Sequence, residues 1–360
     1  MKILSKKYLL KLSILILTML TQISNDLIHH FLGKSDINIL LKSQVIRTLY
    51  DSLNSEYTNS KIRLAMNKMN FPTNKFISKG IKDKLDTRKN VMTLQWTTHG
   101  KSKVINTLQI YLDDNSEPNT KLLVDAISYI TSFSDKNRKI TIHLCLLPDK
   151  KIVKKNTQRL TSANANSGSN HYTDTESVIC VFRREECIKV LFHEIIHGLR
   201  CSNLGIQSEI TERICHKYKI QSENILLDES YTEAWAKILN CRFISSLTNS
   251  STKYQHFCTL LAIETEFSLY QCSKIRGFIK DSNDKNIDKY TNISAYYLVV
   301  GEIFNDLESF FNACGNSPYV RDHKACLEYL YQLDVPKKRK VLKDDKYYNT
   351  LRMSVSELSV

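Results

Sequence analysis

Residues 191–197 read Leu191-Phe192-His193-Glu194-Ile195-Ile196-His197, so that two histidines stand four residues apart and a glutamate follows the first. The surrounding residues 183–200 have the apolar spacing of a helix. On a helix the two imidazoles lie one turn apart on one face, where both can reach the same metal ion. Glu194 lies about 100° further round the helix, beside such an ion without binding it. We therefore predict one Zn²⁺ per chain, bound by His193 and His197, with Glu194 as the catalytic base.

A second acidic segment follows some thirty residues later, within the helical pattern of residues 224–247. It reads Asp228-Glu229-Ser230-Tyr231-Thr232-Glu233-Ala234-Trp235-Ala236. Catalytic zinc usually has three protein ligands and a water molecule, so a third ligand is needed. Glu229 and Glu233 are one turn apart and face the same way. One of them can bind zinc while the other orients a ligand histidine, and the spacing alone leaves both assignments open.

At these residues the chain resembles the gluzincin branch of the zincin metallopeptidases. Thermolysin-like members carry Asn-Glu-x-x-x-Asp on the second helix, and Asp228-Glu229-x-x-x-Glu233 is similar. The resemblance implies that Glu229 is the third ligand and that Glu233 supports a ligand. Alignment with families that carry Glu-x-x-Ala would instead make Glu233 the ligand. The metzincin branch is excluded, because Arg200 and Asn203 stand where its glycine and third histidine would be.

Residues 140–310 also resemble uncharacterised His-Glu-x-x-His proteins of large DNA viruses. The likeness rests on four runs: Asn166-Ser167-Gly168, Ile179-Cys180-Val181-Phe182-Arg183-Arg184-Glu185-Glu186, Tyr231-Thr232-Glu233-Ala234-Trp235-Ala236 and Ser294-Ala295-Tyr296-Tyr297. It implies a viral protein and supplies no substrate.

The expected reaction is hydrolysis of a peptide bond in a peptide or protein substrate, with Glu194 moving the proton of the attacking water. The tetrahedral oxyanion needs a further hydrogen-bond donor. Tyr231 and Tyr297 are candidates, as are Tyr296, His171 and His323. The edge strand that would bind an extended peptide is expected at residues 163–169. The alternative is a catalytically inactive zincin-like protein that serves as a binding or virion structural protein, although a binding protein has no need of Glu194.

The elements indicate an α+β fold that is mostly helical, with a small mixed sheet, the active-site helix and a second, glutamate-bearing helix. Strands are expected at 104–112, 140–146 and 177–182, and helices at 37–50, 122–133, 183–200, 224–247, 254–270 and 294–311. We divide the chain into a signal peptide or membrane anchor (1–24), a mainly helical region (25–135), a zincin-like metallopeptidase domain (136–330) and a loose basic tail (331–360).

The two ends of the chain point to different compartments. Four lysines precede the short apolar run 12–20, an order typical of a secretory signal peptide or a membrane-associated segment. Near the other end, Pro336-Lys337-Lys338-Arg339-Lys340-Val341 resembles a nuclear localisation signal. We therefore expect a secreted or membrane-associated protein, with the nucleus or nuclear membrane as the alternative.

The net charge is +14, from 51 basic and 37 acidic residues. The basic residues are scattered, and no zinc-finger spacing or RRM-type motif occurs, so we do not expect nucleic acid to be the main partner. Ten cysteines all lie at or after Cys145. They suit either a disulfide framework or a set of reduced, buried thiols.

Overall fold

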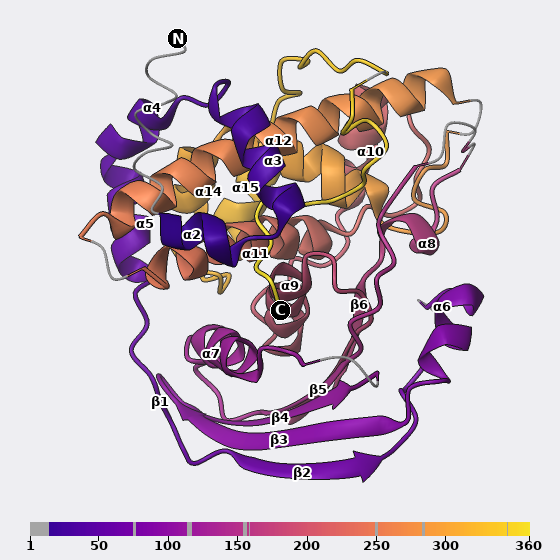
Figure 1. The fold of residues 1–360 in the computed structure, drawn as a ribbon. Coiled ribbons are helices and arrows are strands. Elements are labelled where there is room, and N and C mark those ends of the chain that lie inside the picture. The colour runs from indigo at the N-terminus through magenta and orange to yellow at the C-terminus, as the bar shows by residue number, and fades with distance from the viewer. Residues whose placement is uncertain are drawn as a thin grey trace.

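The computed structural model describes residues 14–74, 77–113, 117–153, 157, 159–248, 251–282, 285–343 and 345–360. The protein is α+β, 47% helical and 15% strand, with 14 α-helices and one mixed sheet of seven strands among the described residues (Figure 1). The expected fold class is therefore confirmed.

The helices of the first half are α2 (Ile14–Met19), α3 (Gln22–Leu32), α4 (Ile37–Lys42), α5 (Gln44–Ser52), α6 (Lys79–Leu85), α7 (Thr120–Thr131) and α8 (Ser162–Ala165). Those of the second half are α9 (Cys187–Gly198), α10 (Ser208–Tyr218), α11 (Leu227–Ser246), α12 (Lys253–Asp281), the π-helix η1 (Ser294–Val299), α13 (Val300–Asn305), α14 (Leu307–Cys314) and α15 (His323–Gln332). The strands are β1 (Thr58–Asn59), β2 (Arg63–Lys68), β3 (Asn90–His99), β4 (Lys103–Tyr111), β5 (Lys139–Leu144), β6 (Gly168–Tyr172) and β7 (Glu176–Val181).

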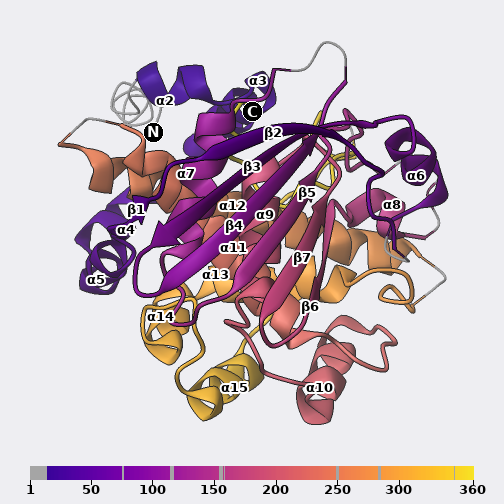
Figure 2. The same ribbon diagram turned by 90° about the horizontal axis from the view of Figure 1, so that it is seen from below.

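The strand order of the sheet is β1-β3-β4-β5-β7-β6, with β2 also paired to β3 (Figure 2). Strands β4, β5 and β7 are parallel, whereas β3 is antiparallel to β4 and β6 is antiparallel to β7. Strand β6 is therefore the edge of the sheet on the side nearest to α9. It begins at Gly168, so the expectation of an edge strand at residues 163–169 is wrong in register: residues 162–165 form the short helix α8.

The sheet crosses the expected boundary at residue 135. The region 25–135 was expected to be mainly helical, yet it contributes β1 to β4, and β4 pairs directly with β5. The expected strands and helices of the second half occur within a few residues of their predicted ends, except that α12 extends to Asp281 and residues 294–311 divide into η1, α13 and α14.

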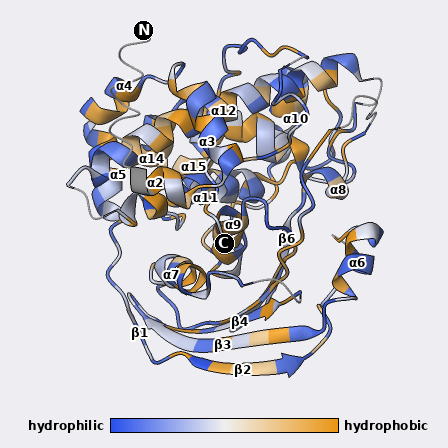
Figure 3. Ribbon diagram, in the orientation of Figure 1, coloured by the Kyte–Doolittle hydropathy of each residue, from blue (hydrophilic) through white to orange (hydrophobic). Residues whose placement is uncertain are grey.

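Helix α9 lies at the centre of the molecule, between the sheet and the helical layer. It packs against β6 and β7 on one side and against α7 and α11 on others, and apolar residues run along it (Figure 3). Ile188, Phe192 and Ile195 of this helix, and Leu199 directly after it, are all buried. Gly198 permits the close approach to the sheet, because a Cβ there would lie 2.5 Å from Ser177 Oγ.

The C-terminal segment, residues 351–358, is buried in the core rather than loose, so the expectation of a loose tail is wrong for these residues. The backbone amides of Met353 and Ser354 donate to Glu186 Oε1, and Val355 N donates to Glu264 Oε2 at 2.9 Å. Arg352 forms ion pairs with Glu185 and Glu357. The C-terminal segment thus supplies backbone donors to Glu186, at the start of α9, and to Glu264, within α12.

The basic motif at 336–341 lies against α12. The Arg339 guanidinium donates two hydrogen bonds of 2.9 Å to Glu266, whereas Lys337, Lys338 and Lys340 are exposed. Nuclear localisation remains a prediction.

At the other end, residues 1–13 of the expected signal or anchor lie outside the described residues. Residues 14–32 form α2 and α3, and Leu20 pairs with Leu358 in an antiparallel bridge. Within the described residues, none of the helices has the length and apolar character needed to cross a membrane. All ten cysteines are free thiols, and all but Cys215 are buried.

Deletion of residues 350–360 should prevent stable folding. It removes the donors that satisfy Glu186 and Glu264 inside the core. A hydrogen bond to a charged group contributes about 1.5–3 kcal/mol, so the loss of several approaches the whole stability of a domain, about 5–15 kcal/mol. Soluble yield and thermal unfolding would measure the effect. Deletion of 359–360 alone, outside the buried segment, is the control, and an unchanged unfolding transition after the longer deletion would contradict this role.

Candidate metal centre

Three elements bring their side chains to one point at the centre of the protein. Helix α9 carries His193, Glu194 and His197, α11 carries Glu229 and Glu233, and η1 carries Tyr296. Helices α9 and α11 pack together, and Ala234 and Ala236 of α11 are fully buried. Small side chains there permit the two helices to approach closely.

His193, His197 and Glu229 form a group that could hold a metal ion, because one donor atom from each lies within 4.8 Å of the others. Glu229 Oε2 is 3.1 Å from His193 Nε2 and 3.2 Å from His197 Nε2. Two imidazole nitrogens and one carboxylate oxygen are a ligand set found in catalytic zinc sites. The residues therefore fit a metal of this type.

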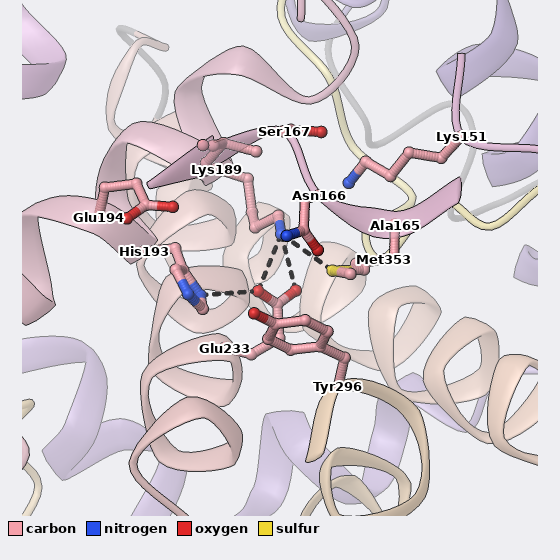
Figure 4. A pocket seen from close by; sticks show the side chains of 12 residues that line it. Lys151, Ala165, Asn166, Ser167, Lys189, His193, Glu194, Glu233, Tyr296 and Met353 are labelled. Atoms are coloured by element: carbon pink, nitrogen blue, oxygen red, sulfur yellow. Dashed lines mark hydrogen bonds and ion pairs between the residues drawn. The ribbon is translucent and has the colours of Figure 1, made fainter. Parts of the chain in front are cut away.

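Glu233 binds the other side of His193. Its Oε2 is 2.9 Å from His193 Nδ1, and both of its oxygens accept from Lys189 Nζ, at 2.7 and 2.9 Å (Figure 4). A carboxylate at Nδ1 directs Nε2 toward the metal and fixes the ring. The structure thus places Glu229 within the group that could hold a metal ion and Glu233 outside that group, against Nδ1 of His193. Lys189 was not singled out in the sequence, although it precedes His193 by one helical turn.

Burial and neighbouring charges shift the pKa values of His193, Glu229 and Glu233 in opposite directions. Burial alone would lower the pKa of His193, but its hydrogen bonds with Glu229 and Glu233 raise that pKa to about 10. Burial alone would raise the pKa of Glu229, but His197 and His193 hold it well below its usual range. For Glu233, the charge of Lys189 overcomes burial and lowers the pKa. A metal ion at His193 would therefore displace a proton from this imidazole.

Glu194 lies beside this group and outside it. Figure 4 shows the Glu194 carboxylate and Glu233 on different sides of the His193 ring. The start of β6 covers Glu194, since a Cβ on Gly168 would lie 2.6 Å from Glu194 Oε1. Burial raises the pKa of the Glu194 carboxyl. Asn170 Nδ2 donates to the Glu194 carbonyl at 2.7 Å, which ties β6 to α9 at this residue.

Among the candidate donors, Tyr296 is the one that the structure places at the site. Its hydroxyl donates to Glu229 Oε2 at 3.1 Å. The hydroxyls of Tyr231 and Tyr297 point elsewhere and donate to the carbonyls of Ser317 and Leu351, so neither supports the role expected of it. His171 and His323 are exposed. The extra residue of a π-helical turn rotates side chains relative to an α-helix, and such turns are frequent at functional sites.

A pocket opens next to His193 and Glu194. Its lining includes Ala165, Asn166, Ser167 and Gly168 from the chain entering β6, together with Lys151, Lys189, Val190, Glu233, Tyr296 and Met353 (Figure 4). The C-terminal segment thus contributes Met353 to the wall of the pocket.

Comparisons of the chain with protein-family models, curated proteins and solved structures found no match. The function must therefore be inferred from the geometry of the site.

Glu229→Gln should weaken Zn²⁺ binding much more than Glu233→Gln. The first change replaces a ligand atom, whereas the second changes a group that orients a ligand, typically a loss of about 10–100-fold in affinity or activity. Competition with a chromogenic chelator would measure both affinities, and circular dichroism would show that both variants fold. The reverse ranking would make Glu233 the ligand.

Proposed function

We propose that this chain is a zinc metallopeptidase of the gluzincin type. The observation that carries the proposal is the convergence of His193, His197 and Glu229 on one point, with Glu194 beside them and outside the ligand group. A structural zinc site is usually closed by four protein ligands, and a site that only binds the ion has no need of a further carboxylate beside it. A buried carboxylate placed next to an ion that could activate water is the additional group that hydrolysis requires.

His193, His197 and Glu229 would hold the Zn²⁺. Bound there, the ion supplies a Lewis acid and a water molecule with a pKa of about 7. Glu194 accepts the proton of the attacking water and delivers it to the leaving amine. Its burial, which raises the pKa of its carboxyl, suits a group that must both take up and release a proton. Tyr296 donates a hydrogen bond to the oxygen on which negative charge develops.

The substrate would lie along β6, which among the described residues pairs with β7 on one side and with no strand on the other. An extended peptide can add to such an edge through backbone hydrogen bonds, and the antiparallel arrangement is the more stable one. Gly168, at the start of this strand, lies directly against Glu194, because a Cβ there would be 2.6 Å from Glu194 Oε1. The scissile bond would lie there, next to the ligand group.

Glu194→Gln tests the proposal most directly. This variant should fold and bind one Zn²⁺, but lose peptide hydrolysis by at least about 100-fold, because the amide cannot accept a proton from water. Zinc content by elemental analysis and cleavage of a peptide library would be measured on both proteins. His193→Ala and His197→Ala serve as controls that should lose zinc as well as hydrolysis.

Two outcomes would contradict the proposal. A parent protein that holds zinc but cleaves no peptide in the library would favour the non-catalytic binding protein. Cleavage that depends on zinc but is unchanged in Glu194→Gln would remove Glu194 as the base.

Tyr296→Phe should lower kcat by about 100-fold at saturating zinc, the lower end for removal of an oxyanion donor. KM should change little, since the hydrogen bond forms as charge develops in the transition state. Tyr297→Phe is the matched control, because the hydroxyl of the adjacent tyrosine donates to the Leu351 carbonyl, 2.6 Å away. It should leave kcat near the parent value, and equal losses in the two variants would contradict the assignment.

A further inference from the structure

The pocket beside the metal centre contains buried hydrogen-bond donors that the protein itself leaves partly unused. Lys151 is 1% exposed, and its ammonium group carries three donor hydrogens. Among the described residues its ion-pair partner is Glu186. Ser167 is also buried, and its Oγ has no hydrogen-bond partner. Both residues line the pocket (Figure 4).

Asn166 adds a third donor at the same place. Its Oδ1 accepts from Thr291 Oγ1 at 2.6 Å, so the Nδ2 end of the amide is the end available to a ligand. Lys189, by contrast, already donates hydrogen bonds to both carboxylate oxygens of Glu233. Among the groups of an unmodified peptide, a carboxylate best satisfies several donors at once, since it offers two acceptor oxygens and no hydrogen.

The size of the pocket limits this group to a short one. The space within the pocket is about 30 Å³, room for about two water-sized atoms such as the two oxygens of a carboxylate. A large apolar side chain would not enter, and a small apolar one would leave Lys151 and Ser167 buried without acceptors, which is costly.

The position of the pocket along β6 identifies which substrate residue enters it. Ala165, Asn166 and Ser167 precede Gly168, which lies against Glu194. A peptide antiparallel to β6 runs from the Tyr172 end toward Gly168 and then past these residues. The pocket therefore receives the residue that follows the cleaved bond and supplies its amine.

We propose that this pocket binds a carboxylate carried by the residue after the scissile bond, either a short acidic side chain, aspartate, or the free C-terminus of a substrate that ends there. The direction of the substrate rests on the proposed peptidase function. The recognition itself belongs to Lys151, Ser167 and Asn166, none of which is a metal ligand or the base.

Binding to the zinc-loaded Glu194→Gln protein tests this without requiring hydrolysis. The probes are C-terminally amidated peptides Ala-Ala-Phe-Xaa-Ala-Ala, with Asp, Asn, Ala or Lys at Xaa, and the peptide Ala-Ala-Phe-Ala with a free or an amidated C-terminus. Calorimetry should show the aspartate peptide, or the free C-terminus, binding at least about tenfold more tightly than its neutral counterpart, as expected for hydrogen bonds to a charged group. The two peptide sets separate the two sources of the carboxylate.

Ser167→Ala should reduce this preference several-fold, and Lys151→Met/Glu186→Gln should abolish it while leaving no unpaired buried charge. Lys217→Met/Glu302→Gln is the control for loss of a partly buried ion pair away from the pocket, since Lys217 pairs with Glu302 on α13. Equal binding of the charged and neutral peptides, or a preference that survives in both pocket variants, would overturn the proposal. Peptide cleavage by the parent protein reports separately on the proposed function.

Discussion

The Glu233 carboxylate holds the metal centre together, because it binds two side chains of α9 from its place on α11. It accepts from Lys189 and contacts Nδ1 of His193, one turn further along the same helix. This contact sets the rotation of α9 against α11, and with it the position of Glu229 opposite both histidines. Since Glu233 and Lys189 are almost completely buried, removal of either would leave an unpaired charge in the core, which is strongly destabilising.

Further buried ion pairs surround this one. Lys151 pairs with Glu186 at the start of α9, Lys237 with Glu264, and Arg352 with Glu185 and Glu357. Such pairs contribute little net stability compared with apolar residues, but they are demanding in geometry. The C-terminal segment completes them with its backbone amides. The C-terminal segment thus supports the start of α9 and contributes Met353 to the wall of the pocket.

Strand β6 and the glycines Gly168 and Gly198 set how closely the sheet packs against the helix that carries His193, Glu194 and His197. Gly168 and Gly198 let β6 and β7 lie directly on α9, where side chains at these positions would collide with Glu194 and Ser177. Glu194 is therefore covered by the start of β6, and the edge of that strand lies next to it. In the proposed peptidase, the donors of Lys151 and Ser167 would lie beside the residue that follows the cleaved bond.

The sequence alone determined the two histidines, Glu194 and the helix that carries them, because ligand spacing and apolar spacing are both local periodicities of one helix. It also predicted the α+β class, β4, β5 and β7, and the helix of Glu229 and Glu233. Only the tertiary structure decided which glutamate faces both histidines, since residues one turn apart are equivalent until a second helix packs against them.

Only the tertiary structure showed that Tyr296, rather than Tyr231 or Tyr297, directs its hydroxyl to Glu229. Tyr296 lies in a π-helical turn, and such a turn has no distinct sequence pattern. The sequence likewise did not predict that residues 351–358 are buried or that hydrogen-bond donors gather around Lys151. Their polar groups are satisfied by partners far away in the chain, and no local pattern records such contacts.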